Sequence, residues 1–201
     1  ELRWEEGAPL SKAAASALDG GESPDALDAI FREKEGTVAG LWVELPSVGP
    51  SRHEELQLWL VELEKLCRRY DALLILDEVK SGFGRSGLWW DWQHFELSPD
   101  MVVFGGGAKI AGVFHHQRLT AISADLGIPD ASQVASSALL LDVIEDEGLV
   151  GHAAVMGSYL LKVLTDLQHL FPQIRSVSSR GLRASFQLPS ESDRDRVLEA
   201  C

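Results

Sequence analysis

Residues 73–82 read LLILDEVKSG, in which four consecutive apolar residues are followed directly by two acids. A short run that is apolar at every position is typical of a strand buried on both faces, as the strands of a parallel sheet are. Two similar runs flank it: residues 38–45 read VAGLWVEL before Pro46, and residues 101–104 read MVVF before three glycines. We expect a strand at each of these places and a further one at residues 112–114.

Helical patterns separate and precede these strands. Residues 53–69 carry leucines and Cys67 on one stripe and acids on the opposite face, which predicts an amphipathic helix. A shorter helix is expected to begin at Pro24, after the N-cap Ser23, and to end at Gly36. The order strand, helix, strand predicts an α/β fold with a mostly parallel sheet and a right-handed crossover.

The pattern changes after the predicted sheet. Two helices are expected at about residues 135–147 and 150–170, and two alternating segments at residues 174–178 and 182–188 predict strands of a smaller, partly antiparallel layer. We expect an N-terminal segment with its helix, then part of a large α/β domain, then helices that lead into a smaller C-terminal domain, at residues 1–35, 36–140 and 141–201.

The composition narrows the class of function. The 201 residues carry a formal net charge of −13, with no cluster of Lys and Arg to offset it, which disfavours nucleic-acid binding. No apolar run reaches the length of about 18 residues that a membrane helix requires, and the first residues lack the pattern of a signal peptide. Cys67 and Cys201 fit no metal-ligand spacing, so we expect a cytoplasmic protein without a metal site.

The acids that follow the apolar runs are the candidate ligand-binding residues. Ligands of open α/β sheets bind at the carboxyl ends of the strands, where Glu44, Asp77 and Glu78 are expected. An acid that closes a buried strand is costly to desolvate unless a cation or a hydrogen-bond donor meets it, which makes Asp77 the strongest candidate. The alternative is that Asp77 only caps a following turn or pairs with Lys80 or Arg85.

A longer stretch around Asp77 resembles a known family. Residues 77–87 read DEVKSGFGRSG, His94 follows, and residues 99–105 read PDMVVFG. This text resembles the signature segment of class III aminotransferases, and within that family it is most similar to 4-aminobutyrate and lysine 6-aminotransferases. The resemblance covers roughly residues 36–198. It implies the three-layer α/β/α large domain of a fold-type-I enzyme that uses pyridoxal 5'-phosphate to transfer an amino group from an ω-amino acid to a 2-oxo acid.

The resemblance implies roles for four residues near the strand ends. Asp77 would pair with the pyridinium nitrogen of the cofactor, which keeps the ring protonated so that it acts as an electron sink. Val79 would pack on a face of the ring, and Lys80 stands where the family usually has a glutamine that touches the phenolic oxygen. Glu44 stands where the family has an acid that orients the substrate or a partner arginine.

The family's Schiff-base lysine is missing from its expected place. It follows the strand that corresponds to residues 101–104, immediately after a glycine or serine, and the residue there is Gly106. Glycine has no amine to offer to the cofactor. Lys109, three residues further along the chain, is the candidate catalytic replacement, because one helical turn could bring its amine to the site.

Three hypotheses remain. The first is an aminotransferase-like protein that is impaired or depends on a partner, as a homodimer or as a heterodimer with an aminotransferase homologue, because class III active sites form at a dimer interface. The second is an active transaminase in which Lys109 or a partner chain supplies the amine. The third is a non-catalytic binding module or structural subunit that keeps the pocket for the cofactor or for an amino acid.

Overall fold

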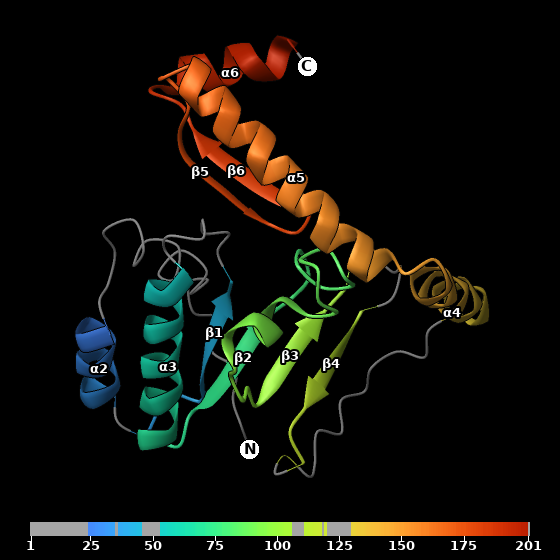
Figure 1. The fold of residues 1–201 in the computed structure, drawn as a ribbon. Helices are drawn as coiled ribbons and strands as arrows, with labels where there is room; N and C mark the ends of the chain where they lie inside the picture. Colours follow the sequence, from blue (N-terminus) through green and yellow to red (C-terminus); the bar gives the residue numbers. More distant parts are fainter. Residues whose placement is uncertain are drawn as a thin grey trace.

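The computed structural model describes residues 24–34, 36–45, 53–105, 111–117, 119 and 130–200. Within these residues the chain forms a four-stranded sheet with helices beside it, followed by a long helix that carries a two-stranded hairpin (Figure 1).

The four-stranded sheet contains the three predicted apolar strands side by side and the fourth predicted strand at its edge. Its order is β1 (Gly40–Glu44), β2 (Leu73–Asp77), β3 (Met101–Phe104) and β4 (Gly112–His115). The first three strands run parallel, which confirms the α/β fold expected from their apolar sequences. β4 runs antiparallel to β3, because the connection between them is too short for the crossover that a parallel pair needs.

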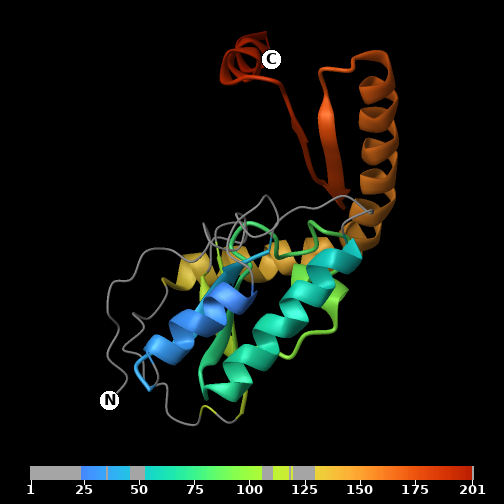
Figure 2. The same cartoon turned by 90° about the vertical axis from the view of Figure 1, so that its left-hand side faces the viewer.

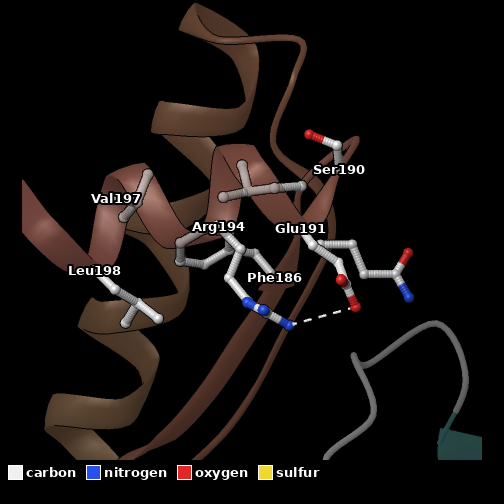
Figure 3. A pocket seen from close by; sticks show the side chains of 8 residues that line it. Phe186, Ser190, Glu191, Arg194, Val197 and Leu198 are labelled. Atoms are coloured by element: carbon white, nitrogen blue, oxygen red, sulfur yellow. Dashed lines mark ion pairs between the residues drawn. The ribbon is translucent and has the colours of Figure 1, made fainter.

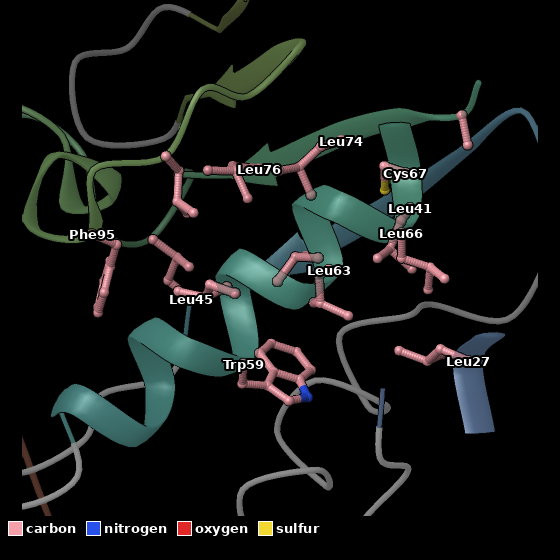
Figure 4. Close-up of a cluster of buried hydrophobic side chains, with 14 of the residues drawn as sticks. Leu27, Leu41, Leu45, Trp59, Leu63, Leu66, Cys67, Leu74, Leu76 and Phe95 are labelled. Carbon is pink, nitrogen blue, oxygen red and sulfur yellow. The ribbon is translucent and has the colours of Figure 1, made fainter. Parts of the chain in front are cut away.

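One face of the sheet packs against the predicted amphipathic helix. This helix, α3, spans His53–Arg69, and α2 spans Pro24–Glu33 beside it. Side chains of the two helices and of the inner strands form one continuous buried cluster (Figure 4). Its members include Leu27, Phe31, Leu41, Val43, Leu56, Leu60, Leu63, Leu74 and Leu76.

The other face of the sheet is less completely covered. Trp42, Glu44 and Asp77 are half-buried there, whereas Val43 and Leu76, which point to α3, are fully buried. A further helix, α4, lies on the opposite side of the sheet from α2 and α3, and most of its residues are exposed (Figures 1 and 2). Polar side chains at the carboxyl end of this face therefore remain accessible to solvent.

α4 spans Ala131–Asp146 and begins before residue 135, where the apolar pattern led us to expect its start. The reason is the N-cap residue Asp130, whose carboxylate accepts a hydrogen bond of 2.6 Å from the backbone N–H of Ser132. Such a cap satisfies one of the backbone donors that a helix start leaves unpaired, so the helix can begin in a stretch without apolar periodicity.

The C-terminal part is built on the long helix α5 (Leu149–Leu170). The strands β5 (Arg175–Arg180) and β6 (Arg183–Gln187) pair antiparallel and lie along this helix, which confirms the predicted antiparallel layer (Figure 1). The last helix, α6, spans Glu191–Ala200.

A hollow of about 320 Å³ lies between β6 and α6, at the tip of the C-terminal part and away from the sheet (Figures 1 and 3). Phe186, Val197 and Leu198 give it an apolar lining, and Arg194 reaches across it to Glu191 over 4.0 Å. The hollow is remote from the strand ends at which the sequence predicts a ligand.

None of the described helices is by itself long and apolar enough to cross a bilayer. α4 and α5 reach that length and composition only together, and the chain bends by 63° between them.

The variant Leu63→Ala tests the packing of α3 on the sheet. Leu63 is only 1% exposed, so we expect the variant to lose about 2 to 5 kcal/mol of unfolding free energy through lost burial and a residual cavity. Leu58→Ala is the control on the same helix, because Leu58 is 69% exposed and its loss should cost about 0.5 kcal/mol or less. Urea unfolding measures both variants, and equal losses would contradict the assignment of the two helix faces.

Candidate functional site

Three charged side chains gather at the carboxyl ends of β1 and β2. Glu44 and Asp77 are the last residues of these strands and lie opposite each other in register. Register partners on neighbouring strands point to the same face, so both carboxylates lie on the half-covered face of the sheet. Lys80 reaches the same place, because its Nζ lies 2.9 Å from Oε1 and 3.2 Å from Oε2 of Glu44.

The carboxylate of Asp77 is held by two donors. Its Oδ2 accepts a hydrogen bond of 3.2 Å from the indole Nε1 of Trp42, and its Oδ1 accepts one of 2.9 Å from the backbone N–H of Val79. Asp77 therefore does cap the turn that follows β2, as the alternative reading of the sequence held, while Lys80 pairs with Glu44. A carboxylate can accept about four hydrogen bonds, so these two leave Asp77 able to accept another from a ligand.

Val79 places an apolar surface beside these charges. Val79 is the second residue after Asp77 and is 40% exposed, and the Lys80 side chain is 71% exposed. The structure thus brings together the four residues that the sequence singled out at the strand ends, and their roles toward a cofactor stay predictions. Gly106 and Lys109 lie outside the described residues.

Glu78, the second acid of the pair, has a different environment. It is completely buried, its Oε2 accepts a hydrogen bond of 2.5 Å from Ser81 Oγ, and its Oε1 accepts one of 2.8 Å from the backbone N–H of Trp92. Burial raises the pKa of the Glu78 carboxyl, and these two hydrogen bonds oppose the increase. The buried Glu78 side chain therefore connects the loop after β2 to residues 91–95 by hydrogen bonds.

A buried ion cluster that the sequence did not predict lies behind this loop. Asp91, which is fully buried, faces Arg180 Nε at 3.2 Å and Arg183 Nη1 at 3.0 Å. The guanidinium of Arg180 also lies 4.7 Å from the centre of the Phe95 ring, which permits a cation–π contact. Arg183 extends to the backbone oxygen of Leu45 at 3.4 Å, just after β1. The hairpin is thus joined to residues 91–95 by charges about ninety residues apart in sequence.

The turn between β5 and β6 packs tightly against the loop after β2. The backbone N–H of Leu182 donates a hydrogen bond of 2.8 Å to the oxygen of Arg85. Gly181 has a φ of +56°, and a Cβ added there would overlap the backbone of Arg85 and Ser86. Only glycine meets both requirements without strain, which explains in structural terms why glycine occupies position 181.

The donor set at the strand ends fits one end of a pyridoxal ring. A fixed carboxylate with remaining acceptor capacity suits a protonated ring nitrogen, and Lys80 offers a primary amine, the group that reacts with an aldehyde. Within the described residues, no group of three or more His, Cys, Asp and Glu side chains could hold a metal ion. The remaining acceptor capacity of Asp77 suits an organic ligand with a cationic N–H.

Comparison with known proteins gives a consistent result. The chain matches the family model described as aminotransferase class-III over residues 13–201. It is similar to the L-lysine-epsilon aminotransferase of Mycobacterium tuberculosis, with 32% identity over 161 residues, which are 75% of this chain and 36% of that protein. It is also similar to the mitochondrial 4-aminobutyrate aminotransferase of Sus scrofa, with 31% identity over 176 residues, which are 84% of this chain and 35% of that protein.

The fold gives the same result as the sequence. A solved structure described as lysine aminotransferase from M. tuberculosis in the internal aldimine form matches with a TM-score of 0.79 and 29% identity. The match covers 99% of this chain and 48% of that one. The chain spans about a third of the length of the curated relatives it matches.

Removing the charge of Asp91 should destabilise the protein strongly. Asp91→Asn leaves two arginines near each other without their carboxylate, and breaking a buried ion pair costs about 3 to 5 kcal/mol. Asp195→Asn is the control, because the Asp195 side chain is 57% exposed in its pair with Arg194, and we expect a loss of at most about 1 kcal/mol. Thermal and urea unfolding measure the losses. A loss in Asp91→Asn no larger than in the control would show that the buried cluster does not hold the hairpin.

Glu78 predicts a particular dependence of stability on pH. The pKa of Glu78 is higher in the folded protein than its ordinary value of 4.5, so protonation of this carboxyl stabilises the folded protein. This contribution to the unfolding free energy is lost as pH rises through the folded pKa. In Glu78→Gln the amide oxygen can still accept from the backbone N–H of Trp92, and the amide nitrogen can donate to Ser81 Oγ, without a charge. The unfolding free energy of the variant, relative to that of the unmodified protein, should therefore increase from acidic to neutral pH.

Glu62→Gln is the matched control for this experiment, because Glu62 is 53% exposed on α3. Urea unfolding of the three proteins between acidic and neutral pH measures the effect. If the curves of Glu78→Gln and the unmodified protein run parallel across this range, the burial of Glu78 is not what makes stability depend on pH.

Proposed function

The chain belongs to the class III aminotransferase family, and from this premise we propose that it is an aminotransferase-like protein that binds pyridoxal 5'-phosphate at Asp77 but transfers amino groups poorly or only with a partner. The observation that carries the proposal is the combination of a retained, well-held Asp77 with Gly106 at the position of the Schiff-base lysine. The residue that would pair with the ring nitrogen is kept, whereas the lysine that normally binds the aldehyde is replaced by glycine.

Each residue of the cluster has a role in this proposal. When bound, pyridoxal phosphate supplies an electron sink for the carbon that carries the amino group. Asp77 accepts the N–H of the ring and keeps that proton in place, and Trp42 holds the carboxylate in position. Val79 covers one face of the ring. Glu44 orients Lys80 and is the acid nearest to an incoming cationic amino group.

The substrate class follows from the relatives. The two similar proteins named above are aminotransferases of lysine and of 4-aminobutyrate, both of which carry an amino group at the end of a carbon chain. We therefore propose an ω-amino acid as the ancestral donor and a 2-oxo acid as the acceptor. The partner that we propose is a second copy of the chain or an aminotransferase homologue, and the proposed location is the cytoplasm. In this proposal residues 36–140 are part of the large domain, and residues 141–201 are the helices and the start of the small C-terminal domain.

Two alternatives lead to different experimental results. In the first, Lys109 or a partner chain supplies the missing amine and the protein is an active transaminase. In the second, the chain is a binding module or structural subunit that keeps the pocket without turnover. The retained Asp77 is consistent with both, so the distinction depends on the amine and on turnover rather than on cofactor binding.

Cofactor binding should depend on Asp77. We expect Asp77→Asn to weaken the binding of pyridoxal phosphate at least tenfold, or about 1.4 kcal/mol, because an amide cannot provide the negative charge that favours the protonated ring. Asp142→Asn, at an exposed position on α4, should leave binding unchanged. Equilibrium dialysis measures both affinities, and equal affinity in the three proteins would refute the assignment of the site.

The same preparations, supplied with an ω-amino acid and a 2-oxo acid, separate the three hypotheses. We expect the isolated chain to bind the cofactor without turnover. When a complete homologue is added, we expect turnover above that of the homologue alone. Turnover by the isolated chain would refute the impaired form of the proposal in favour of an active transaminase. Binding without turnover under both conditions would favour the binding module.

A further inference from the structure

We propose that Lys80 is the residue through which this chain holds the aldehyde of pyridoxal phosphate covalently, in place of the lysine that is absent at position 106. The proposal rests on the proposed function, because it requires the cofactor ring to lie at Asp77. The proposed function places Lys80 near the cofactor, and the new step is a covalent bond between the two.

The position of the Lys80 amine carries the proposal. Both carboxylate oxygens of Glu44 hold the Nζ, at 2.9 and 3.2 Å, and Glu44 is the register partner of Asp77. Neighbouring strands lie about 4.8 Å apart, so the Lys80 amine is held by a carboxylate that lies one strand away from Asp77 on the same face of the sheet.

The shape of the cofactor allows one ring to reach from Asp77 toward the lysine held at Glu44. The ring nitrogen and the aldehyde of pyridoxal lie at opposite ends of one six-membered ring. A ring whose nitrogen contacts Asp77 therefore extends its aldehyde by little more than one ring length. Since Lys80 has a flexible four-carbon stem and starts three residues after Asp77, its amine can meet the aldehyde without a change in the backbone.

Other lysines in the described part of the chain lie elsewhere. Lys34 follows α2, Lys65 lies on α3, and Lys162 lies on α5, so Lys80 alone of the described lysines lies at the carboxyl end of the sheet. Lys65 is otherwise a close match for Lys80, because it is 62% exposed and its Nζ pairs with Glu62 Oε1 at 2.7 Å. It provides the chemical control for an exposed, ion-paired lysine without a neighbouring Asp77.

The bond forms without an oxidant or a reductant. The ammonium of Lys80 first gives a proton to the Glu44 carboxylate or to water, and the free nitrogen pair then adds to the aldehyde carbon. The aldehyde oxygen takes up two protons and leaves as one water molecule, and a carbon–nitrogen double bond remains. The ammonium and the aldehyde are thus converted to a protonated imine and water.

Solvent exposure makes this attachment weaker than that of a buried lysine. The Lys80 side chain is 71% exposed, so water reaches the imine and the reaction runs in both directions. A reversible bond in a wet site retains the cofactor but does not provide the water-excluded environment that efficient amino transfer needs. The proposal therefore agrees with a protein that binds the cofactor and turns over poorly.

The test is to trap the bond and identify the lysine. The protein is incubated with less than one equivalent of pyridoxal phosphate, reduced with borohydride, digested and mapped by mass spectrometry. We expect the adduct on Lys80 to exceed that on Lys65 at least tenfold. Lys80→Arg, which keeps the charge for Glu44, should abolish the dominant adduct, whereas Lys65→Arg should leave it unchanged. Asp77→Asn should reduce the yield on Lys80 to that on Lys65.

The outcomes separate this inference from the function on which it rests. A dominant adduct on Lys109, or equal adducts on all lysines, would overturn the role of Lys80. If dialysis then still shows binding that Asp77→Asn weakens, the proposed function stands without it. If the unmodified protein retains no cofactor by dialysis, the proposed function itself fails. Circular dichroism of the variants confirms that they are folded.

Discussion

The carboxylate of Asp77 ends a strand whose three middle residues are buried, and a partly desolvated carboxylate at this place is stabilised by hydrogen-bond donors. It finds them in Trp42 on the neighbouring strand and in the backbone of Val79. These two bonds fix the first residues of the loop after β2, so that Val79 lies at the surface and Lys80 meets Glu44. The arrangement of the candidate site follows from how this one acid is satisfied.

A second set of buried charges supports the loop from behind. Glu78 binds the backbone at Trp92, and Asp91 binds the two arginines of the C-terminal hairpin. Buried ion pairs contribute little net stability compared with apolar packing, and their better-supported effect is to favour one arrangement over others. Because Arg183 also contacts the oxygen of Leu45, the hairpin, the loop and the end of β1 are held in one geometry.

Particular residues explain which features the sequence could predict. The stripe of leucines in residues 53–69 gave α3 its bounds, and the apolar runs gave the parallel strands, because both are local patterns. The rule that ligands bind at strand ends predicted that Glu44 and Asp77 lie together, whereas Lys80 was singled out only by the family resemblance. The contact of Asp91 with Arg180 and Arg183 could not be predicted, because no periodicity links residues so far apart. The sequence could not predict that Glu78 is buried and Asp77 half-buried, because this difference depends on tertiary contacts and the two acids are adjacent in the same local pattern.

The most direct test of the central claim is nitrogen-15 NMR of labelled pyridoxal phosphate bound to the chain at neutral pH. If Asp77 holds the ring, the ring nitrogen carries a proton in the unmodified protein, and Asp77→Asn shifts its resonance toward that of the unprotonated ring. A ring nitrogen with the same resonance in both proteins would contradict the claim that this strand end is the cofactor site.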